Sequence, residues 1–77
     1  MADELLTVQE LARRLRVSVR TVRRMVAEGR TPEPVRLAGT GRGALRFRAS
    51  DIAAWIKWGL PTQETFRRMR EAERSVR

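Results

Sequence analysis

The chain contains no cysteine and no histidine among its 77 residues, and Lys57 is its one lysine. Without cysteine there are no disulfide bonds and no thiol nucleophile, and without either residue a zinc finger is excluded. The lack of histidine also removes the commonest general base. Asp51 and Glu64 stand at the expected starts of helices, and no carboxylate pair or nucleophile–base set can be assembled around them. We therefore expect no enzyme activity, no metal ion and no cofactor.

Long hydrophobic runs are also absent. A chain this short buries roughly 60% of its unfolded surface, so a pocket that enclosed a substrate would use up its core. The first residues include the acidic Asp3 and Glu4 and precede no long apolar stretch. This pattern predicts neither a signal peptide nor a transmembrane segment. We expect a cytoplasmic protein with no small-molecule substrate and no membrane partner.

The whole chain has a net charge of +8, and acidic residues are scarce in its centre. From Arg13 to Arg48 there are eleven arginines against Glu28 and Glu33, whereas the rest of the chain carries six basic and seven acidic residues. Solvated helix faces normally mix the two signs, and a stretch of one sign repels itself. The pattern therefore favours a polyanionic partner. Arginine, with its planar fork of donors, suits phosphates and guanine edges.

Two short helices joined by a tight turn are predicted over residues 8–28. Thr7 and Glu10 have the spacing of a capping box, which predicts a first helix from there to about Leu15. Its buried face is expected to contain Val8, Leu11, Ala12 and Leu15. Because Ala12 is small, a second helix can cross the first one closely at that point.

The turn between the two helices is expected over residues 16–18, with Val17 buried and Ser18 as the next N-cap. The second helix then runs from about residue 19 to 28 and ends at Gly29 in a left-handed conformation. Its core side carries Val22, Met25 and Val26. Its other side carries Arg20, Thr21, Arg23, Arg24 and Ala27. A helix-turn-helix with an arginine-covered second helix predicts insertion into the DNA major groove.

A β-hairpin is predicted after the proline-containing connector 31–34. Residues 35–37 and 45–47 alternate apolar and basic side chains, as half-buried strands do. Residues 38–44 form a glycine-rich loop that lacks the Lys-Ser/Thr ending of a phosphate-binding P-loop. The hairpin, or wing, carries four arginines: Arg36, Arg42, Arg46 and Arg48.

A third helix is predicted to begin at Ser50–Asp51, with Ile52, Trp55 and Ile56 on one face and with Trp55 in the core. Gly59 to Thr62 then interrupts the chain, and Thr62 caps a last, highly charged helix over about 63–75. The fold class expected is mainly α with a small β-hairpin, with three core helices in residues 1–60 and a C-terminal helix in 61–77.

The C-terminal helix has few apolar positions, among them Phe66, Met69 and Val76. It is too weakly amphipathic to stand alone. Two alternatives stay open: Phe66 and Met69 fold back onto Trp58 and Leu60, or the helix docks on a neighbouring subunit.

Several segments together resemble the small winged helix-turn-helix proteins related to the MerR DNA-binding domain, namely AlpA-like phage regulators and excisionases, also called recombination directionality factors. The matching segments are residues 5–12, 17–22, Gly29, 34–37 and 46–56. The resemblance covers about residues 5–58. The chain departs from the family at Arg16, where many turns have glycine or asparagine, and in a longer wing tip at 40–44.

The resemblance implies that the second helix lies in the major groove and that the wing contacts the backbone or the minor groove. The implied recognition-helix residues are Ser18, Val19, Arg20, Thr21, Arg23 and Arg24. The implied wing residues are Arg36, Arg42, Arg46 and Arg48. The implied partners are double-stranded DNA, an integrase, and further copies of the chain on adjacent sites. The implied roles are promoter control and steering of DNA recombination toward excision.

Two other interpretations stay open. One is a protein-interaction module, an adaptor to an integrase or polymerase with generic nucleic-acid affinity. The other is RNA binding, which the low aromatic content disfavours because no aromatic residue lies among the arginines as a stacking platform.

Overall fold

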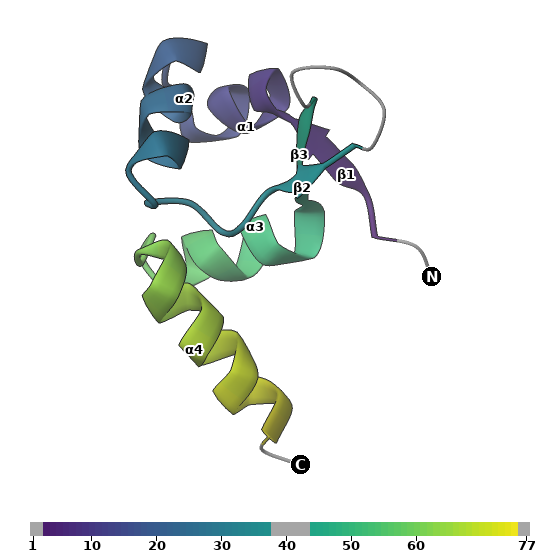
Figure 1. The fold of residues 1–77 in the computed structure, drawn as a ribbon, viewed down its shortest axis with the longest axis vertical. Coiled ribbons are helices and arrows are strands. Elements are labelled where there is room, and N and C mark those ends of the chain that lie inside the picture. The colour runs from purple at the N-terminus through teal and green to yellow at the C-terminus, as the bar shows by residue number, and fades with distance from the viewer. Residues whose placement is uncertain (1–2, 38–43, 76–77) are drawn as a thin grey trace.

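The computed structural model describes residues 3–37 and 44–75. In this part of the chain four helices surround a small antiparallel sheet of three strands in the order β1-β3-β2 (Figure 1). The elements are β1 Leu5–Thr7, α1 Val8–Leu15, α2 Val19–Ala27, β2 Val35–Arg36, β3 Leu45–Arg48, α3 Ala49–Lys57 and α4 Gln63–Ser75. The expected class, mainly helical with a small antiparallel sheet, is confirmed.

Strand β1 was not expected from the sequence. It pairs antiparallel with β3, so that Leu6 lies opposite Phe47, and both side chains are buried. Leu5 next to them is exposed, as the two-residue period of a strand requires. Three residues are too few to show that period in a sequence, and the partner strand lies about 40 residues away. The hairpin of β2 and β3 itself is confirmed, with Val35 opposite Arg46.

The capping box at the start of α1 is confirmed. The Glu10 backbone N–H donates to Thr7 Oγ1 at 3.0 Å, and Glu10 Oε1 accepts from the Thr7 backbone N–H at 2.8 Å. Two hydrogen bonds lower the pKa of Glu10. The larger effect comes from the bond that the Thr7 backbone N–H donates to the carboxylate, and the smaller one from the bond with the Thr7 side chain. Because β1 ends at Thr7 and α1 begins at the next residue, this box fixes the direction in which α1 leaves the sheet.

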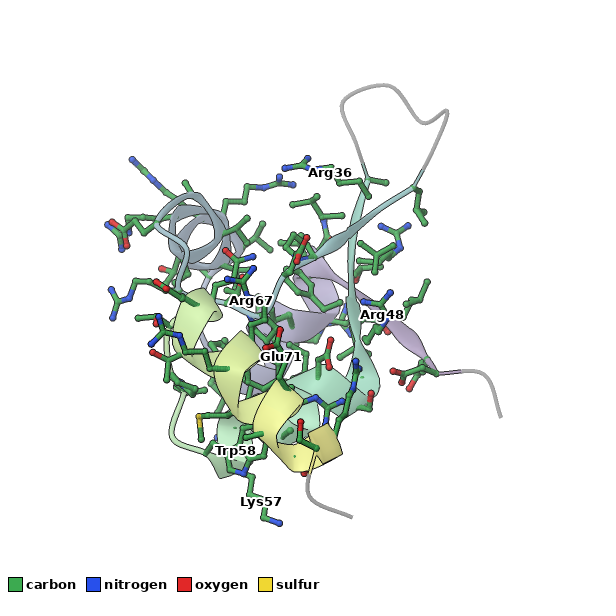
Figure 2. The ribbon with its side chains drawn as sticks, turned by 60° about the horizontal axis from the view of Figure 1, so that its bottom comes forward. Arg36, Arg48, Lys57, Trp58, Arg67 and Glu71 are labelled. Atoms are coloured by element: carbon green, nitrogen blue, oxygen red, sulfur yellow. The ribbon has the colours of Figure 1, made fainter. Side chains whose placement is uncertain are left out.

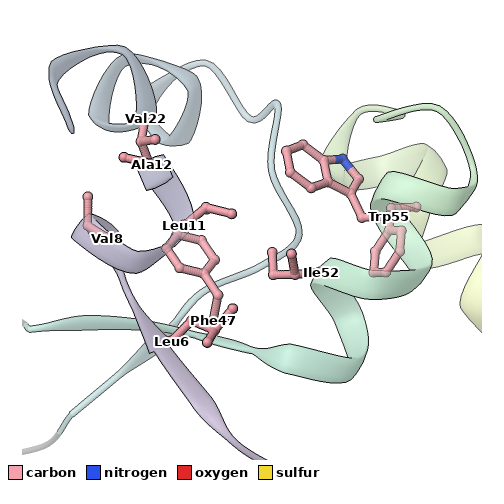
Figure 3. Packing of buried hydrophobic residues seen from close by; sticks show 9 residues of the cluster. Leu6, Val8, Leu11, Ala12, Val22, Phe47, Ile52 and Trp55 are labelled. Atoms are coloured by element: carbon pink, nitrogen blue, oxygen red, sulfur yellow. The ribbon is translucent and has the colours of Figure 1, made fainter. Parts of the chain in front are cut away.

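One hydrophobic cluster connects the helices and the sheet (Figure 3). Its members are Leu6, Val8, Leu11, Ala12, Val22, Phe47, Ile52, Trp55 and Phe66. One expectation about this core is wrong: Val17 is 39% exposed. Ile56, expected on the same face of the third helix as Ile52 and Trp55, is 44% exposed while those two are buried. Val17 closes the turn through its backbone N–H, which donates to the Ala12 carbonyl at 3.0 Å, and its side chain stays at the surface. Ile56 is exposed because α4 packs on the other flank of α3, at Trp58.

Helix α4 folds back onto α3 through Phe66, which confirms the first of the two alternatives for this residue. Phe66 is 4% exposed, and its ring centroid lies 5.6 Å from that of Trp58. Met69 is half-buried, Leu60 is 46% exposed, and Val76 lies outside the described residues. Phe66 therefore serves the core of its own chain and offers no free apolar anchor to a neighbour.

Polar contacts also connect α4 to the remainder of the molecule. The Trp55 indole N–H donates to the Pro61 carbonyl at 2.8 Å, and the Gln63 backbone N–H donates to the Gly29 carbonyl at 2.9 Å. Arg70 donates from Nη2 to Asp51 Oδ1 at 3.0 Å. These bonds connect α4 both to α3 and to the end of α2.

Asp3 supplies a cap for α3 that the sequence did not indicate. Its Oδ2 accepts from the Ser50 hydroxyl at 2.5 Å, and its Oδ1 accepts from the Ser50 backbone N–H at 3.2 Å. The Ser50 hydroxyl bond is the main cause that holds the pKa of Asp3 below its ordinary value. The helix therefore begins at Ala49, one residue before the expected start.

We expect Asp3→Asn to destabilise the fold at neutral pH and to lose this effect in acid. A carboxyl group whose pKa is lower in the folded state stabilises that state above its ordinary pKa, and the contribution disappears as the pH falls through the folded pKa. Thermal unfolding of both proteins from neutral pH down to about pH 2 measures this difference. Glu4→Gln, at the neighbouring carboxylate, is the control, and an Asp3→Asn effect that stayed constant with pH would contradict the prediction.

We expect Phe66→Ala to lower the free energy of unfolding by about 3 kcal/mol, because it leaves a cavity between α3 and α4. Urea unfolding followed by tryptophan fluorescence measures the loss. Leu60→Ala, which shortens a side chain that is 46% exposed, is the matched control and should cost under about 1 kcal/mol. Equal losses in the two variants would show that α4 does not contribute to the core.

Candidate nucleic-acid interface

The outer face of α2 is exposed and basic. Val22 is fully buried, Met25 and Val26 are half-buried, and Arg20, Arg23 and Arg24 are exposed. Residues four apart share one side of a helix, so Arg20 and Arg24 lie one turn apart opposite Val22. Arg23 lies on a flank of the helix, between that outer face and the core side.

The N-terminus of α2 is capped by Ser18, as expected. Ser18 Oγ accepts from the Thr21 backbone N–H at 3.1 Å, and the two hydroxyl oxygens lie 3.0 Å apart. The first turn of α2 contains no acidic residue, so the positive end of the helix dipole is not neutralised there. Val19 is half-buried and packs against the core cluster, which leaves Ser18 and Thr21 as the polar groups at this end.

The turn between α1 and α2 depends on Arg16 in a left-handed conformation, with φ 58° and ψ 43°. Its backbone N–H donates to the Arg13 carbonyl at 3.2 Å. A glycine adopts this conformation without steric cost, and an arginine does not. The departure seen at Arg16 in the sequence therefore corresponds to a strained position in the fold. At the other end of α2, Gly29 has φ 68°, which confirms the expected left-handed residue there.

The wing arginines divide between two regions of the surface. Arg36 and Arg46 line a hollow of about 280 Å³ together with Arg23 of α2. Arg48 lines a different groove of about 730 Å³, to which α4 contributes Arg67 and Glu71 (Figure 2). Arg42 lies outside the described residues.

The hollow between α2 and the wing is lined without any carboxylate. Its lining residues are Val8, Gln9, Arg23, Arg36, Ala44, Leu45 and Arg46. The ion pairs among the described residues involve Arg30, Arg68 and Arg70, so Arg23, Arg36 and Arg46 have no acidic partner within 4 Å there. Arg46 donates from Nη1 to the Leu45 carbonyl at 2.9 Å. The sequence showed these arginines but not that two elements bring them together, and it did not indicate Gln9.

The groove beside α4 was not expected from the sequence, and its lining mixes both signs. It contains Glu33, Asp51, Glu64 and Glu71 as well as Arg48, Arg67, Arg70 and Arg74. Such a lining does not select a polyanion, in contrast to the hollow beside α2.

Other kinds of site find no support in the described part of the chain. Over residues 3–37 and 44–75 no three metal-binding side chains gather at one point. In the same ranges no helix has the length and apolar character needed to cross a bilayer.

Comparison with known families gives one match, to a family model described as a helix-turn-helix domain, over residues 5–57. The matched segment contains the sheet and helices α1 to α3 and leaves out α4. Curated proteins and solved structures give no match to the chain.

We expect Arg16→Gly to raise the free energy of unfolding by about 0.5 kcal/mol. Glycine removes the strain of the left-handed turn, and the higher entropy of the unfolded chain with glycine offsets part of this gain. Chemical denaturation of both proteins measures the change. Arg13→Gly, the same replacement at a helical position of α1, should lower stability by about 1 kcal/mol. Loss of stability in both variants would contradict the account of the turn.

Proposed function

Because the chain belongs to the helix-turn-helix domain family, whose members typically bind DNA, we propose that it reads a specific double-stranded DNA sequence. In this proposal it is a MerR-related, AlpA-like protein that acts as an excisionase or as a small transcriptional regulator, and it works in the cytoplasm. Residues 1–60 form the DNA-binding domain, and 61–77 provide contacts to other proteins.

The observation that carries the proposal is the exposed arginine face of α2, next to a wing that is also basic. Arg20 and Arg24 lie where a helix in the major groove meets base edges, and Ser18 and Thr21 lie at its N-terminus. Major-groove edges distinguish all four base pairs, and an arginine can bind guanine through two hydrogen bonds. In the proposal the wing arginines Arg36, Arg46 and Arg42 contact the backbone or the minor groove, whereas Arg48 lines the groove of mixed charge beside α4 and lies apart from this surface. Phosphate contacts of this kind add affinity without sequence information.

Helix α4 supports a role in assembly on DNA. Its last turn lies at the opposite end of the molecule from α2 and the wing, along the longest dimension of 39 Å (Figure 1). A domain of this size reads a short site, so binding to several adjacent sites increases its specificity. We assign the contact with an integrase or with a second copy to the exposed side of α4, next to the half-buried Met69. Phe66 is buried within its own chain, and Val76, the other apolar residue proposed for this contact, lies outside the described residues.

The proposal is tested by selecting duplexes from a random DNA pool with the wild-type protein and measuring binding to the selected duplex by gel shift with excess shuffled competitor. A discrete complex or a regular ladder that survives the competitor supports sequence-specific binding. A smear that disappears with competitor would leave generic polyanion affinity, as the adaptor alternative requires.

We expect Arg20→Ala and Arg24→Ala to weaken binding to the selected duplex by about 5- to 150-fold, the range of one lost bidentate contact with a base. Binding to a shuffled duplex should change by only a few fold, because the bases there are not matched. Lys57→Ala, which removes one positive charge at the end of α3, is the control. Equal losses on both duplexes would show that the outer face of α2 does not read bases.

A further inference from the structure

We propose that Arg23 of α2 and Arg36 of β2 form a clamp for one backbone phosphate of the DNA, located in the hollow between the recognition helix and the wing. The inference rests on the proposed function and assigns a role within it. In this inference Arg23 positions the helix on the duplex, and Arg20 and Arg24 read the bases.

The geometry brings Arg23 and Arg36 to one hollow from separate elements. Both Arg23 and Arg36 line the hollow of about 280 Å³. Arg36 leaves the wing on the side of α2 (Figure 2). The two residues are 13 positions apart in the chain and meet only because the hairpin stands beside the helix.

The electrostatics of the hollow favour an anion. Arg23 and Arg36 are exposed, and neither forms an ion pair within the described residues. With Arg46, three like charges line this hollow and repel one another. A phosphate bound by both Arg23 and Arg36 replaces part of this repulsion with two charge-assisted contacts. A guanidinium presents its donors in a planar fork that matches phosphate oxygens. Gln9, a further lining residue, adds a side-chain amide that can donate a hydrogen bond.

The position of Arg23 on α2 separates it from the base-reading residues. Arg20 and Arg24 lie at the centre of the exposed face, opposite the buried Val22, whereas Arg23 lies on the flank that faces the wing. When a helix lies in the major groove, its central face meets the base edges and its flanks meet the backbone that borders the groove. A DNA phosphate is therefore the anion that reaches this hollow when α2 is inserted.

The first experiment compares salt dependence on the selected and the shuffled duplex. Arg23→Ala and Arg36→Ala should each reduce the slope of log K against log salt by about one unit and weaken both duplexes by the same factor, about tenfold. Arg24→Ala should weaken the selected duplex far more than the shuffled one. Lys57→Ala, which removes one positive charge at the end of α3, is the control and should leave the slope unchanged.

The second experiment identifies the phosphate. Methylphosphonates, which carry no charge, replace the phosphates of the selected duplex one at a time. At one position the replacement should remove the effect of both Arg23→Ala and Arg36→Ala, because partners in one contact are not additive. If no single position does so for both variants, or if Arg23→Ala changes the preferred sequence, the clamp is wrong.

These outcomes separate the clamp from the proposed function. If the wild-type protein binds the selected and shuffled duplexes alike, sequence-specific function fails, and the salt slopes still decide on the clamp. If it binds no duplex, both fail. If it discriminates between the duplexes while Arg23→Ala and Arg36→Ala keep the wild-type slope, the clamp alone fails.

Discussion

The pairing of β1 with β3 is the interaction on which the candidate interface depends. Helix α1 begins at the residue that follows β1, and β3 carries β2 on its other edge, so this ladder sets the position of the helices relative to the wing. A slip of one residue in register would turn Leu6 away from the core and expose it to solvent. Burial of Leu6 against Phe47 therefore fixes the spacing between α2 and β2, and with it the hollow that contains Arg23 and Arg36.

The charges of the molecule have two separate uses. Its carboxylates stabilise the fold: Glu10 caps α1, Asp3 caps α3, and Asp51 binds Arg70 of α4. The arginines of α2 and β2 are left without such partners in the described residues, although their mutual repulsion lowers the stability of the free protein. A ligand that binds only the folded state adds its binding free energy to stability. A polyanion on this face therefore relieves the repulsion and strengthens the fold at the same time.

Local patterns predicted the helices and the hairpin well, because caps and periodicity act within a few residues. Thr7 with Glu10 predicted the start of α1, and Gly29 predicted the end of α2. Strand β1 and the Asp3 cap escaped prediction because their partners lie 39 to 47 positions away in the chain. The exposure of Ile56 was not visible in the sequence, because it depends on the side from which α4 approaches. The same limit applies to the interface: the arginines of α2 were visible in the sequence, but the meeting of Arg23 with Arg36 depends on hairpin placement.

The ladder between Leu6 and Phe47 also shapes how the chain reaches its fold. Closing a loop of about 40 residues costs conformational entropy before any buried contact compensates for it. The core is complete only when Phe66 has packed into it, so the cluster that contains Leu6 cannot close before α4 has docked. During synthesis from the N-terminus, α1 and α2 leave the ribosome long before their partners. The arginine-rich helices α1 and α2 are therefore made before β3 and Phe66, and their few apolar residues stay uncovered until those partners follow.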